Sequence, residues 1–378
     1  MTGRPAEIAA GIGEAGLGAA KRAWRATGWT GQHLRHVAGL AVPGRNPAAR
    51  VYESIGADCF VALAPGWLNL GLWDGPGTEE EAAIACRRLV QTVASAVPAG
   101  GVVVDVGNGL GTQDPVIAEI TRPRRLIAVN IAEWQLSAGK DRLREASAVP
   151  VAGDAARLPL ASGVADGLIS VEAAFHFRSR RAFFEECYRV LRPGGVLSMT
   201  DISTERWPRG PTELASGLAQ LRVFGLRPSA AMTAGQIAAA ARAAGLVEVE
   251  VTRCGDRVIA PSLRVIGARL SGSPQAPLGH RTAARVLLSQ VELLWRHRII
   301  DYLLVSPPKD AQAAGWRLVI GMTLMFLLAP ASRAGYFVYP LGLSAWLLLT
   351  RPGWLGRTGG PDLQVVDDPV PPQQLHLR

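Results

Sequence analysis

The fold is decided by residues 101–111, which read Gly101-Val102-Val103-Val104-Asp105-Val106-Gly107-Asn108-Gly109-Leu110-Gly111. The β-branched run over residues 102–104 predicts a buried parallel strand. The strand ends in an acidic residue and three alternate glycines, and a helix-like segment over residues 116–120 follows. Glycines let the backbone approach a ligand closely, and the N-terminus of the next helix offers unpaired N–H groups to a negatively charged group. The stretch therefore predicts a strand, loop and helix that together hold a ligand.

Two classes of ligand-binding protein use such a unit. Dinucleotide-binding proteins need G-x-G-x-x-G, and counting from Gly107 the third glycine would fall at Thr112. The order here, D-x-G-x-G-x-G, resembles the first motif of the class I S-adenosylmethionine (SAM)-dependent methyltransferases. By itself the motif leaves open an ordinary glycine-rich turn after a strand.

A second strand and helix are predicted at residues 125–130 and 131–136. In the methyltransferases that the chain resembles, an acid at the end of this strand accepts both ribose hydroxyls of SAM. This sequence has Asn130, whose amide can accept one hydroxyl proton but supplies no charge, so we expect a weaker ribose contact. The amide is also unfavourable to NAD, which requires an acid at this position.

The third unit, residues 150–160, contains Gly153-Asp154-Ala155 followed by Leu158-Pro159-Leu160. It resembles the family segment "GDAxxLPF". The resemblance implies that the Asp154 side chain accepts the adenine amino group and that the backbone N–H of Ala155 reaches the ring. A surface turn is the alternative, and a Gly-Asp pair suits one.

Two further segments complete the resemblance. Residues 165–177 resemble the fourth strand and its loop, "FDxVxxxExxxH", and residues 183–197 resemble "FFxExxRVLRPGGxL". The latter predicts an amphipathic helix, a Pro-Gly-Gly reversal and a fifth strand that ends at Asp201. The order and spacing of the four motifs identify the chain as a class I methyltransferase of the type that acts on small molecules, lipids and natural products. The expected fold is α/β and Rossmann-like, with a seven-stranded, mostly parallel sheet covered by helices on both faces.

The site residues follow from the resemblance. His176 follows the fourth strand and matches a histidine often found there, so it is the candidate base; Asp201 could orient or assist it, while a histidine that only caps a helix is the alternative. Glu172 is expected near the cofactor rather than as a base. The predicted cofactor contacts are Asp105, Gly107, Asn108, Gly109, Gly111, Asn130, Ile131, Gln135, Asp154, Ala155 and Glu172. No metal is predicted, because the four cysteines are far apart in the sequence and form no C-x-x-C pair.

The sequence divides into four parts. Residues 1–50 are an N-terminal extension, and residues 51–310 are the methyltransferase domain, with an alternating strand expected at 246–251. The resemblance implies that a region at about 202–231 forms a lid over the substrate. Within the domain, Trp67-Leu68-Asn69-Leu70-Gly71-Leu72-Trp73 resembles the "LNxGyW" segment that packs over the cofactor mouth in the family. Residues 311–355 are an apolar helical hairpin, and residues 356–378 are a disordered tail.

The hairpin is outside the family pattern. Its two uncharged runs, residues 318–329 and 334–350, are each shorter than the roughly 20 residues that cross a bilayer. Aromatic residues and arginines near their ends are typical of a membrane interface. We therefore predict attachment to the cytoplasmic face of a membrane through residues 316–350; a helix pair buried against the domain or a partner, in a cytoplasmic protein, is the alternative.

Composition narrows the function. The chain carries a net charge of +9, but only three of its 40 basic residues are lysines and the arginines are scattered, so we predict no nucleic-acid partner. A hydrophobic content of 48% is high for a wholly soluble protein. The resulting prediction is methyl transfer from SAM to a small, hydrophobic or lipid-like acceptor (a natural product, isoprenoid or glycolipid), with O-methylation slightly favoured. A non-catalytic binding module and an NAD-dependent oxidoreductase are the alternatives, and the oligomeric state stays open.

Overall fold

A computed structural model describes residues 62–223, 226, 231–272 and 278–307, together with the single residues Val319, Thr323 and Ser344. The chain divides into two compact units, Met1–Lys309 and Asp310–Arg378. Apart from the three single residues, the predicted extension, hairpin and tail lie outside the described residues. Within the described part, no helix has the length and apolarity that crossing a membrane requires.

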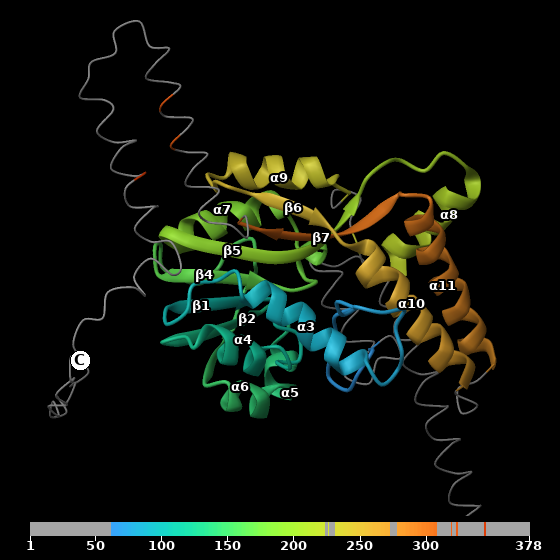
Figure 1. Ribbon diagram of the computed structural model, residues 1–378, viewed down its shortest axis with the longest axis horizontal. Helices are drawn as coiled ribbons and strands as arrows, with labels where there is room; N and C mark the ends of the chain where they lie inside the picture. Colours follow the sequence, from blue (N-terminus) through green and yellow to red (C-terminus); the bar gives the residue numbers. More distant parts are fainter. Residues whose placement is uncertain are drawn as a thin grey trace, which may run out of the picture. The chain divides into compact units, whose positions relative to one another are not determined.

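The first unit is built on a seven-stranded sheet (Figure 1). In chain order the strands are β1 (Val102–Val106), β2 (Arg125–Asn130), β3 (Ala148–Ala152), β4 (Ala165–Ser170), β5 (Leu191–Thr204), β6 (Glu250–Arg253) and β7 (Ile300–Ser306). Their order across the sheet is β3-β2-β1-β4-β5-β7-β6. The first five pair in parallel, whereas β7 runs antiparallel to both β5 and β6. This mixed, mostly parallel sheet confirms the fold predicted from the motifs.

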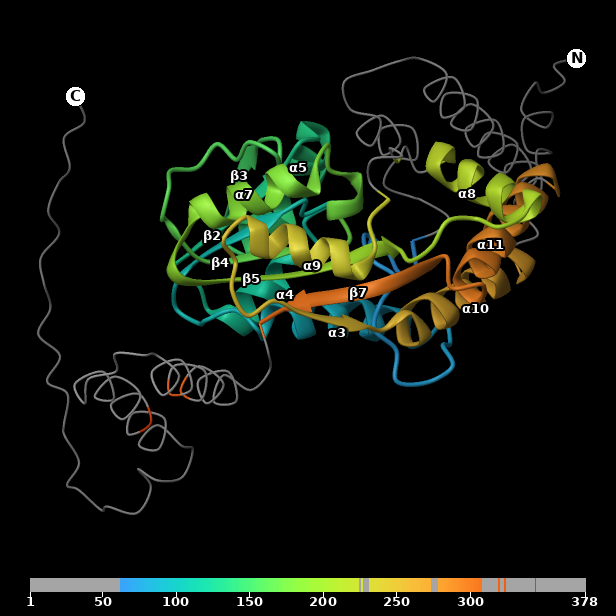
Figure 2. The ribbon, with the colours of Figure 1, turned by 90° about the horizontal axis from the view of Figure 1, so that it is seen from above.

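Helices cover both faces of the sheet. They are α3 (Ala82–Ala94), α4 (Asp114–Thr121), α5 (Glu133–Ala138), α6 (Lys140–Glu145), η1 (Ala174–His176), α7 (Arg180–Val190), α8 (Pro211–Val223), α9 (Ala234–Ala243), α10 (Gly255–Gly272) and α11 (Leu278–Arg296). Figure 2 shows α3 and α4 on one side of the strands and α7 and α9 on the other.

Strand alternation explains the two layers. Successive side chains of a strand point to opposite faces, so Val103 joins the core beneath α3 and α4, and Val104 joins the core beneath α7 and α9. Ile169 and Leu168 of β4 divide between the same two cores. All four side chains are fully buried. A parallel strand covered by helices on both faces must be apolar on both faces, so its sequence is a continuous β-branched or aliphatic run.

Two expected elements differ from the structure. The alternating strand expected at residues 246–251 begins only at Glu250, because Gly245 and Glu248 both adopt left-handed backbone conformations that interrupt an extended chain. In the expected lid region, residues 211–223 form α8, which packs against α11 (Figure 1). Residues 224–225 and 227–230 of that region lie outside the description.

Candidate functional site

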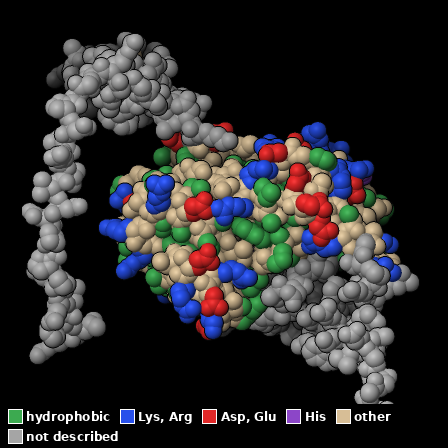
Figure 3. All heavy atoms as spheres, turned by 60° about the horizontal axis from the view of Figure 1, so that its bottom comes forward, with side chains coloured by type: hydrophobic (Ala, Val, Ile, Leu, Met, Phe, Trp, Pro, Cys, Tyr) green, Lys and Arg blue, Asp and Glu red, His purple; other side chains and the backbone are tan. Residues whose placement is uncertain are grey.

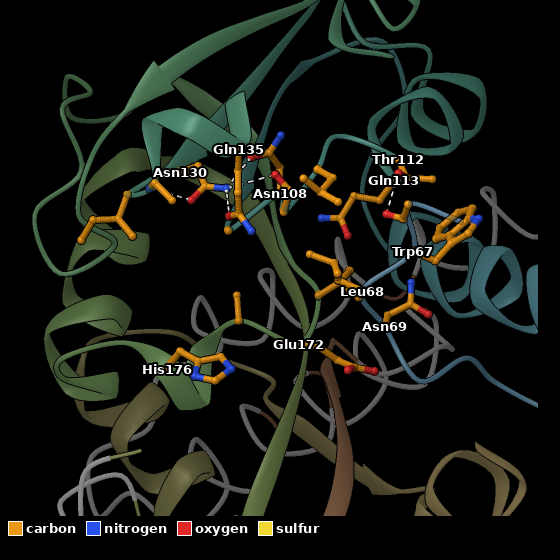
Figure 4. A pocket seen from close by; sticks show the side chains of 18 of the residues that line it. Trp67, Leu68, Asn69, Asn108, Thr112, Gln113, Asn130, Gln135, Glu172 and His176 are labelled. Carbon is orange, nitrogen blue, oxygen red and sulfur yellow. Dashed lines mark hydrogen bonds between the residues drawn. The ribbon is translucent and has the colours of Figure 1, made fainter. Parts of the chain in front are cut away.

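A pocket opens at the carboxyl ends of β1, β2 and β4, the edge at which open α/β sheets bind ligands (Figure 4). It brings together eight of the residues predicted from the sequence: Gly107, Asn108, Gly109, Asn130, Ile131, Gln135, Glu172 and His176. The predicted residues outside its lining are Asp105, Gly111, Asp154, Ala155 and Asp201. Residues 66–69 also line it, as do Leu110, Thr112, Gln113 and Phe177, which were not singled out as site residues.

The glycine loop needs its glycines for two reasons. Gly107 has a φ of +82°, and a Cβ there would lie 2.4 Å from Cβ of Ala173, so both conformation and space exclude a side chain. Gly109 has a φ of +57°, and its Cβ would stand 3.1 Å from Cδ1 of Leu68 across the pocket. The loop therefore exposes backbone to the pocket at close range.

Two carboxyl groups lie beneath the loop and not in the pocket. Asp105 is fully buried and accepts hydrogen bonds from Nε2 of Gln113 at 2.9 and 2.7 Å. Asp114, at the start of α4, is equally buried and accepts one from Nδ2 of Asn108 at 3.2 Å. Burial raises the pKa of both carboxyls. Asp105 thus fixes Gln113 in the pocket wall instead of offering its own oxygens to a ligand.

Asn130 is held on both sides of its amide. Its Oδ1 accepts from the backbone N–H of Ala132 at 2.9 Å, and its Nδ2 donates to the carbonyl of Gly109 at 3.2 Å. Nδ2 also lies 3.2 Å from Oδ1 of Asn108 and 3.0 Å from Oε1 of Gln135 (Figure 4). The sequence led us to expect the amide oxygen to receive a ribose hydroxyl; one of the two lone pairs of that oxygen accepts from Ala132, and the ribose contact stays a prediction.

Residues 62–73, here called the strap, run along the pocket and supply its wall at 66–69. Three of the hydrogen bonds that hold the strap fasten the part that runs along the pocket: Thr112 Oγ1 donates to the carbonyl of Gly66 at 2.8 Å, the N–H of Leu70 donates to Glu172 Oε1 at 2.7 Å, and Cys86 Sγ donates to the carbonyl of Asn69 at 3.4 Å. Further bonds hold its two ends, from Arg269 to the carbonyls of Ala62 and Leu63 and from the N–H of Leu72 to the carbonyl of Ala85. The W-L-N-L-G-L-W pattern had marked this segment, although it did not single out Trp67, Leu68 and Asn69 as pocket residues.

Glu172 is a pocket residue under backbone strain. It has a φ of +50°, a conformation that side-chain-bearing residues rarely adopt and that clusters at functional sites. Burial raises the pKa of its carboxyl to about 7, and hydrogen bonds from Leu70 and Tyr302 partly oppose that rise. Both bonds end on Oε1.

His176 closes the opposite wall from the short helix η1 (Figure 4). Burial, and then the positive charge of Arg180, lower its pKa to about 3, so the imidazole is neutral at physiological pH. Asp201 was expected to assist it. The structure places Asp201 in a fully buried ion pair with Arg180, with Nε–Oδ2 at 2.7 Å and Nη2–Oδ1 at 2.9 Å. Asp201 therefore pairs with Arg180, a residue that sequence reasoning missed, and it is the charge of Arg180 that acts on the pKa of the histidine.

Asp154 and Ala155 follow β3, two and three residues beyond the position that pairs with Asn130. Oδ1 of Asp154 accepts from the backbone N–H of Ala156 at 2.9 Å, which closes a tight turn. Their predicted contacts with adenine stay a prediction.

The charge of the pocket is distinctive. Its lining residues, all within the described part of the chain, include one carboxyl group (Glu172), one histidine and neither lysine nor arginine. A cation is favoured in such a pocket over a group with several phosphates. On the face of the molecule in Figure 3, basic and acidic side chains are interspersed instead of forming a single-sign patch.

Comparison with known proteins gives the same picture. The sequence family described as "Methyltransferase domain" matches residues 104–199. The erythromycin 3''-O-methyltransferase of Saccharopolyspora erythraea is 30% identical over 226 residues, which cover 57% of this chain and 73% of that enzyme. The 27-O-demethylrifamycin SV methyltransferase of Amycolatopsis mediterranei is 27% identical over 279 residues, covering 71% and 99%. Among solved structures, the cyclopropane synthase MmaA2 from Mycobacterium tuberculosis shares the fold with a TM-score of 0.57 at 16% identity, over 70% of this chain and 98% of that one.

Proposed function

Because this chain belongs to the class I SAM-dependent methyltransferases, we propose that it methylates a hydroxyl group of a small, hydrophobic acceptor and that His176 receives the proton. The observation that carries the proposal is the neutral imidazole of His176 in the wall of the cofactor pocket. Membership in this family disfavours the two alternatives, a non-catalytic binding module and an NAD-dependent oxidoreductase.

The pocket residues fit SAM. Its lining offers one carboxyl group and no basic side chain to a cofactor whose sulfur is positively charged. The Gly107 backbone, which a Cβ would block, gives the close approach that the cofactor requires. Gly107, Gly109, Gln135 and Glu172 are the residues that would hold it. When bound, SAM supplies a methyl group that an oxygen nucleophile can accept by in-line displacement.

The chain's own residues then have two tasks. The strap and the glycine loop hold the reactants in alignment, which is the main contribution a protein can make to such a transfer. His176 removes the proton of the acceptor hydroxyl. A pKa of about 3 is low for a base, but a hydroxyl becomes strongly acidic as its oxygen gains a methyl group, so a neutral imidazole suffices late in the transfer. Burial keeps the imidazole neutral, and the charge of Arg180, which is paired with Asp201, adds to that effect.

The acceptor class is inferred from the relatives. Two relatives that this chain matches over most of their length are named for methylating an oxygen atom of erythromycin and of rifamycin. We infer a hydroxylated natural product of comparable chemistry for this chain. Attachment to the cytoplasmic face of a membrane through residues 316–350 would favour an acceptor that partitions into lipid; this part of the proposal rests on the sequence alone.

The test is direct. The full-length protein is incubated with SAM labelled in its methyl group and a panel of hydroxyl-bearing macrolides, ansamycins and isoprenoid alcohols, and the site of labelling is read by NMR. An O-methyl product supports the proposal; a C- or N-methyl product contradicts it. On the product-forming acceptor, His176→Ala should then lower kcat by about 100-fold or more while leaving the affinity for SAM unchanged. An unchanged kcat would remove His176 from the reaction.

A further inference from the structure

Four polar side chains form a buried chain of hydrogen bonds beside the pocket: Asp114, Asn108, Asn130 and Gln135. Figure 4 shows the last three of them. The orientation of this hydrogen-bonded chain is set by the backbone. The N–H of Ala132 can only donate, so the atom of Asn130 that faces it is the amide oxygen. The carbonyl of Gly109 can only accept, so the atom that faces it is the amide nitrogen. The two assignments agree, and they fix the amide of Asn130 without reference to any other side chain.

The orientation of Asn130 decides that of its neighbours. Its Nδ2 faces Oδ1 of Asn108 and Oε1 of Gln135, at 3.2 and 3.0 Å. Asn108 must therefore turn its own Nδ2 to Asp114, where it donates at 3.2 Å. Gln135 must turn its Nε2 away from Asn130. Asn108, Asn130 and Gln135 are all at least nine-tenths buried, so water cannot replace these bonds easily.

We propose that Asn130 is a positioning residue for the cofactor: it does not accept a ribose hydroxyl itself but holds the Gln135 amide so that Nε2 donates to a hydroxyl oxygen of the cofactor. The proposal rests on the membership of this chain in the SAM-dependent methyltransferases. It follows that an amide is required at position 130. An acid, the residue that related enzymes have there, would not suit this pocket.

The reason is the set of atoms around Nδ2. Three oxygens, from Gly109, Asn108 and Gln135, lie 3.0–3.2 Å from it. In Asn130→Asp an oxygen of nearly the same size replaces this nitrogen, and at neutral pH it carries no proton to donate. The three neighbouring oxygens would face a negative charge, and Gln135 would rotate to present Nε2 to the new carboxylate. The donor would then be turned away from the cofactor.

The experiment measures S-adenosylhomocysteine binding to the full chain by calorimetry, so it needs no acceptor and is independent of whether the product is an O-methyl group. At pH 8 we expect Asn130→Asp to bind about tenfold more weakly or worse, and Gln135→Ala similarly. Because one residue acts through the other, the double variant should bind no more weakly than the weaker single variant.

Asn69→Asp is the matched control. Asn69 is a buried asparagine that lines the same pocket. Its amide also accepts from a backbone N–H and donates to a backbone carbonyl, and neither of these bonds involves Gln135. Its effect should add to that of Gln135→Ala. A second readout is pH. Protonation gives the introduced carboxyl an O–H donor, so the ratio of variant to wild-type affinity should recover as the pH falls from 8 to 5.5, and a purely structural defect would not recover.

Two results would overturn the proposal. One is Asn130→Asp binding S-adenosylhomocysteine as tightly as the wild type or more tightly, as direct ribose contact predicts; the other is additive losses in the double variant. If Asn130→Asp does not fold, Gln135→Glu provides the test. This variant keeps an acceptor for Asn130 but loses the Nε2 donor. It should therefore fold normally and bind S-adenosylhomocysteine about tenfold more weakly. Wild-type-like binding by Gln135→Glu would exclude the assignment.

Discussion

The hydroxyl group of Tyr302 on β7 donates a hydrogen bond of 2.8 Å to Oε1 of Glu172, 130 residues earlier in the chain. The N–H of Leu70 ends on the same oxygen. One carboxylate oxygen therefore joins β7, the end of β4 and the strap. Glu172 is thus a structural junction as well as part of the pocket wall.

The junction should make stability depend on pH. Burial raises the pKa of Glu172 from 4.5 in the unfolded chain to about 7, so the folded protein retains a proton that the unfolded chain loses. The free energy of unfolding should therefore fall as the pH rises from about 4.5 through about 7, by up to about 3 kcal/mol. Glu172→Gln keeps an acceptor for Leu70 and Tyr302 but cannot titrate. Urea denaturation at pH 5 and pH 8 should show a smaller loss in the variant than in the wild type, because the buried carboxyls of Asp105 and Asp114 still titrate with raised pKa values in both. Identical pH dependence in both would contradict the assignment.

Breaking the buried ion pair should cost far more than breaking an exposed one. Asp201→Asn leaves the Arg180 guanidinium buried without its counter-charge, which should lower the free energy of unfolding by about 3–5 kcal/mol. Asp141→Asn removes an exposed partner of Arg144 and should change it little. Chemical denaturation of both variants is the measurement. A small effect for Asp201→Asn would mean that Arg180 finds another partner or reaches water.

The glycine loop offers a test that separates strain from collision. Gly107→Ala combines a φ of +82° with a Cβ 2.4 Å from that of Ala173, whereas Gly163→Ala, at φ +66°, meets no atom within 4 Å. Both should lose about 1–2 kcal/mol from the backbone conformation alone. Only Gly107→Ala should also weaken S-adenosylhomocysteine binding, by about tenfold, and Ala173→Gly should rescue part of that loss. Equal binding by both alanine variants would show that the loop does not approach the cofactor.

The membrane proposal is tested by truncation after Lys309. The full chain should sediment with membranes and require detergent, while the truncated chain stays in the supernatant, because each buried CH₂ contributes about 0.8 kcal/mol to attachment. Binding of S-adenosylhomocysteine by the truncated chain checks that the first unit is intact. Equal solubility of the two forms without detergent would reassign residues 316–350 to packing or oligomer contacts.

How much the sequence could predict depends on whether a feature is local. The strands could be predicted from the sequence because a buried parallel strand must be apolar on both faces, as residues 102–104 are. The close approach of the loop at Gly107 could be predicted because its backbone conformation favours glycine. The role of Asn130 is not visible, since it depends on a carbonyl and an N–H that any residue at positions 109 and 132 would carry. The pairing of Asp201 with Arg180 likewise depends on how α7 lies against β5, which no local pattern records.

The same limit explains the strand expected at 246–251. Alternation was present in the residues, but a left-handed backbone at Glu248, a residue with no strong preference for that conformation, breaks the extension. Sequence patterns describe which faces are apolar; they do not describe where the chain turns when the turn residue is not glycine.

The way the strap is fastened bears on how fast the cofactor can be exchanged. The part that runs along the pocket, residues 66–70, is fastened by hydrogen bonds to Thr112, Cys86 and Glu172, none of which belongs to the sheet, while further bonds at Arg269, Ala85 and Arg257 hold the two ends of the strap. The part along the pocket can therefore detach in a local opening whose free energy is well below that of global unfolding. At a pH high enough for every opening to lead to exchange, the rate of amide hydrogen exchange at Leu70 equals the rate of opening. If a ligand in the pocket must wait for the strap to lift, this exchange rate sets an upper limit on how often the enzyme can replace its spent cofactor.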